Sequence, residues 1–200
     1  MIQYHNNIPF CILQQEEENI SINFKAIAGF LESIEPQLMS IPNDTSTAYK
    51  ADDMSARFNR WNIFYVPEPI LIPVFTLIKI GWKQLNDELT LLGKEPLWIH
   101  AHGNLHRKDQ KLGYHAHKYP ILGYVGISSE GSNTNFYTGE NEDTKISIPN
   151  KNGQLVITLG TIPHDTDVWN KNYPRCSIAF NLMTRNELFL DNPPVFPFYV

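Results

Sequence analysis

The sequence has few of the features that mark a specialised class of protein. It contains only two cysteines, Cys11 and Cys176. They allow at most one disulfide, which excludes a disulfide-rich secreted scaffold and favours two free thiols in a reducing compartment. The chain also lacks a low-complexity tract, and its 42% hydrophobic and 18% charged residues are typical of a folded globular protein. We therefore expect a chain that folds on its own.

Charge and hydrophobic runs exclude two kinds of partner. The formal net charge is −5, and no stretch gathers Lys or Arg into a stripe, so we expect no binding to nucleic acid. No apolar run approaches the roughly 18 residues of a membrane span, and the first residues lack the basic and apolar regions of a signal peptide. These absences predict a cytoplasmic protein that does not bind membranes.

The length of 200 residues fits a single domain, 1–200. Residues 1–95 have a mixed character. Apolar residues at helical spacing predict one helix over residues 26–38 and a second that begins near residue 74 and stops at Gly93. Between these helices the polar residues 40–60 predict a long loop.

Residues 96–190 consist of short apolar or alternating runs separated by turn residues, which predicts closely spaced antiparallel strands. The predicted strands are 96–102, 113–117, 121–128, 135–139, 145–149, 153–160, 175–183 and 187–190. The expected fold is mainly β with helices, in the α+β class. The close spacing favours an antiparallel barrel or a double-sheet jelly roll, and we expect a double-stranded β-helix (jelly roll, cupin-like) with an N-terminal helical layer packed on one sheet.

Three histidines of this β region have the spacing of a metal site. His115 and His117 lie two residues apart, so in a strand they project from one face. His164 follows a later strand and a Gly-Thr-Ile-Pro turn. A close pair and a distant third ligand are typical of a facial triad that leaves open coordination positions on a metal.

A histidine pair also arises by chance, so surface or core histidines are the alternative. The chain contains a second pair, His100 and His102, followed by His106. Histidines His100 and His102 precede the predicted metal strand and could line the same pocket.

Arg175 and Ser177 strengthen the functional interpretation of the triad. Both residues open a predicted strand and share one of its faces. An arginine that faces the inside of a barrel is costly unless it meets an anion, and its planar guanidinium suits a carboxylate. A serine hydroxyl beside it can donate to the same carboxylate.

Several motifs occur in a characteristic order between Trp98 and Asn181, over less than half of the chain. Each is loose by itself, but their order and the short gap from His164 to Arg175 resemble the iron(II)- and 2-oxoglutarate-dependent oxygenases related to prolyl hydroxylases. The motifs are Trp98, Gly-Tyr-His-Ala-His at 113–117, Ile-Leu-Gly-Tyr-Val at 121–125, Ile-Pro at 148–149, Gly-Gln-Leu-Val-Ile at 153–157, Pro-His at 163–164 and Arg-Cys-Ser-Ile-Ala-Phe-Asn at 175–181.

The resemblance implies that His115 and His164 bind Fe(II), and that Arg175 and Ser177 bind the far carboxylate of 2-oxoglutarate. The wider superfamily has an acidic residue where His117 stands, although related sequences also show His-x-His. Two arrangements follow: a triad of three histidines, or iron held by two histidines and the cosubstrate with His117 beside them.

Two further assignments come from the same resemblance. The resemblance places Tyr124 at the cosubstrate. The motif around Tyr124 lacks the serine of the family and lies one residue closer to His117, so the alternative is that Tyr124 does not reach the cosubstrate. Asp165 and Asp167 follow His164 and offer acceptors for the second ring nitrogen of a ligand, or are solvated turn residues.

The activity implied is the O2-dependent oxidative decarboxylation of 2-oxoglutarate to succinate and CO2, coupled to hydroxylation of an unidentified small molecule or protein side chain. One alternative is a cupin-type metal-binding protein or a dioxygenase that does not use 2-oxoglutarate. Cupins usually have a glutamate soon after the histidine pair, and here Lys-Tyr-Pro-Ile-Leu follows it. The other alternative is a non-catalytic jelly-roll protein with a structural or interaction role.

Overall fold

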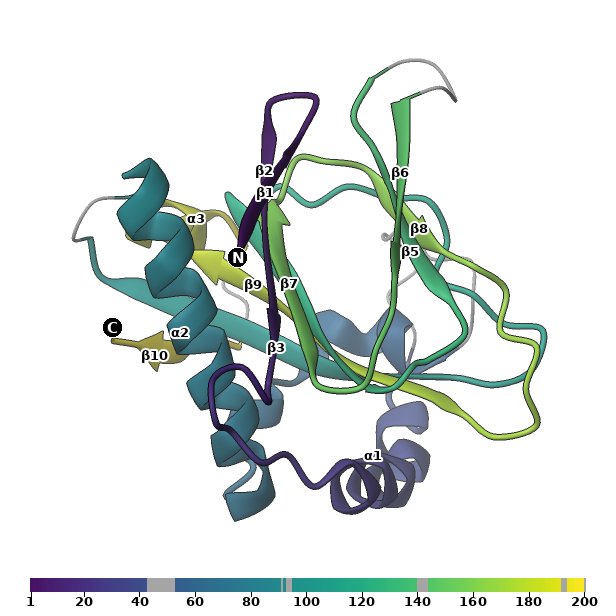
Figure 1. Ribbon diagram of the computed structural model, residues 1–200. Helices are drawn as coiled ribbons and strands as arrows, with labels where there is room; N and C mark the ends of the chain where they lie inside the picture. Colours follow the sequence, from purple (N-terminus) through teal and green to yellow (C-terminus); the bar gives the residue numbers. More distant parts are fainter. Residues whose placement is uncertain (43–52, 91, 93–94, 140–143, 192–193, 200) are drawn as a thin grey trace.

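The structure is a computed structural model that describes residues 1–42, 53–90, 92, 95–139, 144–191 and 194–199 (Figure 1). The strands are β1 (Ile2–His5), β2 (Ile8–Gln14), β3 (Leu97–His106), β4 (Ile121–Ser128), β5 (Asn133–Tyr137), β6 (Lys145–Pro149), β7 (Gln154–Leu159), β8 (His164–Thr166), β9 (Arg175–Met183) and β10 (Phe196–Phe198). The α-helices are α1 (Phe24–Met39), α2 (Ile72–Leu89) and α3 (Arg185–Asp191), and short 3-10 helices cover η1 (Met54–Arg60), η2 (Ile63–Tyr65) and η3 (Pro69–Leu71).

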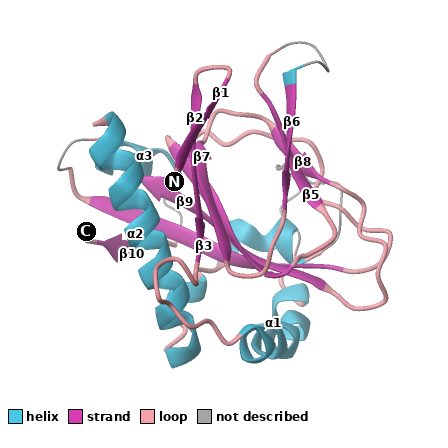
Figure 2. Ribbon diagram, viewed as in Figure 1, coloured by secondary structure: helices cyan, strands magenta, loops and turns pink. Residues whose placement is uncertain are grey.

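Two antiparallel sheets face each other and form a jelly roll. The large sheet has the order β1-β2-β7-β4-β9-β3-β10, and the small sheet has the order β6-β5-β8. Helices α1 and α2 cover the face of the large sheet that points away from the small sheet (Figures 1 and 2). The predicted fold class, a double-stranded β-helix with a helical layer on one sheet, is confirmed.

Alternation along the strands of the large sheet separates an apolar face from a polar one. On β9 the residues that belong to the core beneath the helices are Cys176, Ile178, Phe180 and Leu182. The alternate residues point into the space between the sheets and are Arg175, Ser177, Ala179 and Asn181. Strand β3, which pairs with β9, repeats this pattern with His100, His102, Asn104 and His106 on the inner side. Period-two alternation therefore places the polar side chains of both strands inside the barrel.

The structure corrects several predictions of local structure. Residues 187–190 are not a strand but part of α3. The signal for this helix is a capping box, in which the backbone N–H of Thr184 donates to Glu187 Oε2 (2.7 Å) and that of Asn186 donates to Thr184 Oγ1 (3.3 Å). Residues 113–117 form no regular strand and contribute one isolated bridge, from His115 to His164. Strands β1, β2, β8 and β10 are not predicted by the sequence.

The helices differ from the prediction at their ends. Helix α2 stops at Leu89, because Thr90 adopts a left-handed conformation (φ 51°) and its N–H donates to Asn86 O. Gly93, the predicted stop, lies outside the described residues. Of the predicted loop 40–60, residues 54–60 form η1 and residues 43–52 lie outside the described part. Both cysteines are free, as predicted, and both are buried. Within the described residues, none of the helices has the length and apolarity to cross a membrane.

Gly81 sets the distance between α2 and the large sheet. A Cβ atom at this position would lie 2.3 Å from Leu155 Cδ2 and 3.1 Å from Ile157 Cδ1, both in the buried core. Glycine in a helix interior ordinarily costs about 1 kcal/mol relative to alanine. Here the missing Cβ permits close packing, which offsets that cost.

We expect Gly81→Ala to lower the free energy of unfolding by about 1–3 kcal/mol, because the added methyl group overpacks the core. Gly29, on the exposed side of α1, is the matched control, since a Cβ there would meet nothing within 4 Å. Gly29→Ala should raise the free energy of unfolding by about 0.5–1 kcal/mol. Urea unfolding followed by circular dichroism measures both changes. Equal stabilisation by the two substitutions would contradict the packing role of Gly81.

Candidate functional site

Backbone hydrogen bonds bring the three predicted histidines together. His115 and His164 exchange two bonds, from His115 N to His164 O (3.0 Å) and from His164 N to His115 O (2.8 Å). The backbone N–H of His117 donates to Gly160 O at 3.0 Å, in the turn that leads to His164. The segment that carries the His-x-His pair is therefore fixed along the edge of β8.

The three rings converge on one point. One ring nitrogen from each histidine lies within 4.8 Å of the other two. The Nε2 atoms of His115 and His117 are 3.1 Å apart. Ring centroids are 4.3 Å apart for His115 and His164, and 5.1 Å apart for His117 and His164. The structure thus confirms the proximity that the spacing predicts.

Each of the three rings is oriented by an oxygen at its other nitrogen. The Nδ1 atoms of His115, His117 and His164 lie 2.7 Å from Gly113 O, 2.6 Å from Asn181 Oδ1 and 3.2 Å from Ile162 O. Because these oxygens only accept, Nδ1 carries the proton in each ring and Nε2 carries a lone pair.

Burial lowers the pKa of all three imidazoles, that of His117 to about 3. The rings are neutral at pH 7, so protons do not relieve the repulsion between the lone pairs on Nε2 of His115 and His117. A divalent transition metal does relieve it. Metal–nitrogen bonds of about 2.1 Å at right angles place two nitrogens about 3 Å apart, close to the observed separation. The donor set therefore fits a metal ion with open coordination positions.

A buried guanidinium lies in the same cavity as the triad. Arg175 Nε donates to Ser132 Oγ (3.2 Å), and Arg175 Nη1 lies 3.4 Å from His106 Nδ1. Within the described residues, Arg175 forms no ion pair with a carboxylate. Its side chain lines the cavity together with His115, His117 and His164. A buried cation without a partner charge is costly, so this position fits an anionic ligand.

Ser177 and Tyr124 line the same cavity as Arg175. Ser177 lies two residues beyond Arg175 on the inner side of β9, and Tyr124 on β4 is paired with Ala179. The Tyr124 hydroxyl is buried and has the side chain of Thr134 as its polar neighbour. Burial raises the pKa of Tyr124 to about 12, so it remains a phenol that can donate to an anion.

The second histidine pair divides between two environments. His102 lines the cavity, one of the roles considered for the pair, and its Nδ1 is buried without a partner in the described structure. His100 does not line it; its Nε2 lies 2.8 Å from Phe58 O, a carbonyl of η1. His100 therefore holds η1 against the inner face of β3.

The aspartates after His164 do not orient the triad. Asp165 accepts from Asn135 Nδ2 (2.9 Å) and from Tyr137 OH (3.1 Å), and Asp167 accepts from the backbone N–H of Asn133 (2.9 Å). Both carboxylates thus tie β8 to β5, and each triad ring has another oxygen at its Nδ1.

Asn181 and His106 were missed by the reasoning from sequence. Asn181 holds the His117 ring and is fully buried on β9. Asn181 is the last residue of the motif at 175–181. The period-two alternation from Arg175 to Asn181 is the signal that places it on the inner face. The contact between His106 and Arg175 depends on the register of β3 against β9, which spacing alone does not supply.

The fold matches solved structures of non-heme oxygenases. A prolyl-4-hydroxylase from Pseudomonas putida superposes with a TM-score of 0.55 at 12% sequence identity, over 88% of each chain. The non-heme monooxygenase ThoJ superposes as a nickel complex and as the apo form, with TM-scores of 0.54 and 0.53 at 11% and 10% identity, over 94% of this chain and 76% of that chain. No protein-family model and no curated protein matches the sequence. At this low identity the likeness shows that the chain shares the fold of these two enzymes.

We expect the chain to bind one divalent transition metal, measured with Co(II) or Ni(II) by calorimetry under anaerobic conditions. His164→Ala should weaken this affinity more than about 100-fold, since loss of a direct ligand exceeds the 10- to 100-fold effect of losing an outer partner. His5, whose ring packs on Phe10 at 5.5 Å, is outside the triad, so His5→Ala should bind metal like the wild type. Unchanged affinity in His164→Ala would remove His164 from the metal site.

Proposed function

We propose that the chain is an Fe(II)- and 2-oxoglutarate-dependent oxygenase that hydroxylates a substrate not yet identified. The observation that carries this proposal is one cavity lined both by three imidazoles whose ring nitrogens converge and by a buried guanidinium that forms no ion pair with a carboxylate of the described structure. A metal ion and a dicarboxylate supply what each group lacks. The oxygenase fold of the solved structures supports the same assignment.

In this proposal His115, His117 and His164 hold Fe(II), and the outer partners at Nδ1 keep their Nε2 atoms aimed at the ion. Three neutral ligands leave the site one unit more positive than two histidines and a carboxylate would. An anionic cosubstrate is therefore favoured at this metal. Bound iron and 2-oxoglutarate would supply the oxidation of a C–H bond by O2, with release of succinate and CO2.

The remaining cavity residues bind and orient the cosubstrate. Arg175 pairs with the far carboxylate, and the hydroxyls of Ser177 and Tyr124 donate to it. The keto-acid end is thereby directed toward the triad. A cupin without 2-oxoglutarate has no use for Arg175, so the buried guanidinium favours the oxygenase over that alternative.

Arg175→Ala should weaken the binding of 2-oxoglutarate to the metal-loaded protein about 10- to 100-fold, the loss expected for hydrogen bonds to a charged group. Metal affinity should not change, since Arg175 does not touch the triad. Arg107 is the matched control because it is exposed and pairs with Glu35 on the surface. Calorimetry of metal and then of 2-oxoglutarate separates the two effects. Equal cosubstrate affinity in Arg175→Ala and Arg107→Ala would rule out the anchoring role.

His117→Asp tests whether His117 is a ligand. If it is, the variant should retain metal, because a carboxylate completes the commoner facial triad of two histidines and one acid. His117→Leu, which offers no donor, should lose most of the affinity. The two variants are compared by the same metal titration. Complete loss of metal in a folded His117→Asp protein would count against His117 as a ligand.

A further inference from the structure

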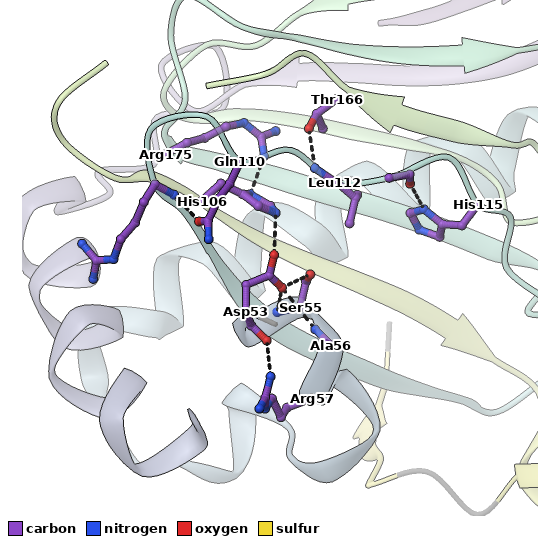
Figure 3. A network of polar contacts seen from close by, with 12 residues as sticks. Asp53, Ser55, Ala56, Arg57, His106, Gln110, Leu112, His115, Thr166 and Arg175 are labelled. Carbon is purple, nitrogen blue, oxygen red and sulfur yellow. Dashed lines mark hydrogen bonds and ion pairs between the residues drawn. The ribbon is translucent and has the colours of Figure 1, made fainter. Parts of the chain in front are cut away.

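A buried polar chain continues behind Arg175, away from the triad (Figure 3). His106 on β3 is paired in register with Arg175 on β9, and its side chain is 1% exposed. Asp53, at the start of η1, lies on the far side of the His106 ring, with His106 Nε2 and Asp53 Oδ2 3.8 Å apart. The proposed function uses Arg175 but assigns no role to His106 or Asp53.

The hydrogen-bonding capacity of Arg175 determines where the proton of His106 lies. A guanidinium only donates, so His106 Nδ1, 3.4 Å from Arg175 Nη1, must accept. The one proton of the neutral ring is then on Nε2, facing Asp53 Oδ2. Neither His106 Nε2 nor Asp53 Oδ2 has a hydrogen-bond partner in the described structure. Burial and the nearby Arg175 lower the pKa of His106 to about 3, so the ring stays neutral.

Asp53 is fixed independently of His106. Its Oδ1 caps η1 by accepting from the backbone N–H of Ser55 (2.9 Å) and of Ala56 (3.3 Å). The other carboxylate oxygen is thus held toward the ring of His106. A carboxylate on one side and a guanidinium on the other select a single tautomer of the imidazole.

Two acceptors hold the guanidinium at two of its three nitrogens, Nε and Nη1. Ser132 Oγ accepts from Arg175 Nε, and its position is set by donation to Ser129 O at 2.8 Å. His106 Nδ1 takes Nη1. Within the described residues, Nη2 makes no hydrogen bond, so this part of the fork remains for a ligand in the cavity.

We propose that His106, with its tautomer set by Asp53, is a positioning residue that aims the Arg175 guanidinium at the far carboxylate of the cosubstrate. This inference rests on the proposed function. His106 does not touch the cosubstrate; it acts through Arg175, and its effect is confined to ligands that carry a second carboxylate. Such a ligand should bind less tightly when the acceptor at the Nδ1 position is removed.

Two substitutions separate the acceptor from the rest of the ring. In His106→Asn, the amide oxygen can occupy the position of Nδ1 and accept from Arg175. In His106→Gln, the amide reaches the position of Nε2, and no acceptor remains near Nδ1. Both variants are polar and of similar size, so neither simply removes the packing of the ring.

The experiment measures the affinities of the anaerobic Co(II)-loaded protein for 2-oxoglutarate and for 2-oxobutyrate, which lacks the far carboxylate. Wild type should prefer 2-oxoglutarate, and Arg175→Ala should abolish the preference. His106→Gln should reduce the preference about 10-fold with unchanged affinity for 2-oxobutyrate, whereas His106→Asn should stay close to wild type.

The other outcomes show whether the proposed function or only the positioning role of His106 is wrong. A wild type without preference for 2-oxoglutarate, or a preference that survives Arg175→Ala, overturns the proposed function and this inference with it. If both of those controls behave as expected but His106→Gln keeps the preference, the positioning role alone is wrong. Equal weakening of both keto acids, or the same loss in His106→Asn as in His106→Gln, also overturns it, because either result reflects a general structural role.

Discussion

Repulsion between imidazole lone pairs is the constraint on which this site depends. Nε2 of His115 and Nε2 of His117 are 3.1 Å apart, and neither carries a proton because Nδ1 of each ring faces an oxygen. Burial keeps the rings uncharged. Without a cation, such an arrangement is unfavourable, and the backbone hydrogen bonds between His115 and His164 hold it in place. The fold thus maintains a donor set that fits a metal ion.

The inner face of β3 and β9 also holds a charged group whose direct neighbours are uncharged. Arg175 brings one positive charge into the barrel, and the nearest groups that the structure places on it are a serine hydroxyl and a neutral imidazole. The carboxylate of Asp53 is one residue further away, beyond His106. The positive charge of Arg175 is therefore not neutralised by a direct ion pair. The guanidinium remains able to attract a dianion.

Much of the fold could be predicted because its signals are local. The alternation in residues 121–128, 145–149 and 175–183 gives strands with the observed bounds, and the apolar spacing gives both long helices. The three histidines could be singled out because their signals are local: His115 and His117 are two residues apart, and a turn precedes His164. The signal for α3 was present in the capping box at Thr184 and was overridden by an apolar run.

The remaining features depend on contacts between distant parts of the chain. Residues 113–117 pair with β8 through one isolated bridge. A single bridge leaves no period-two pattern in the sequence, so this pairing could not be predicted. The partner of His106 follows from the register of β3 with β9, and Asp53 reaches it from η1, about fifty residues earlier in the sequence. The partners of Asp165 and Asp167 depend on the same kind of contact, because they belong to β5.

A crystal structure of the chain with Mn(II) in place of Fe(II) and with 2-oxoglutarate, prepared without O2, tests the central claim most directly. The account predicts anomalous density about 2.1 Å from Nε2 of His115, His117 and His164, with the far carboxylate of 2-oxoglutarate against the guanidinium of Arg175. A metal bound elsewhere, or a cosubstrate that leaves Arg175 without a carboxylate, would contradict it.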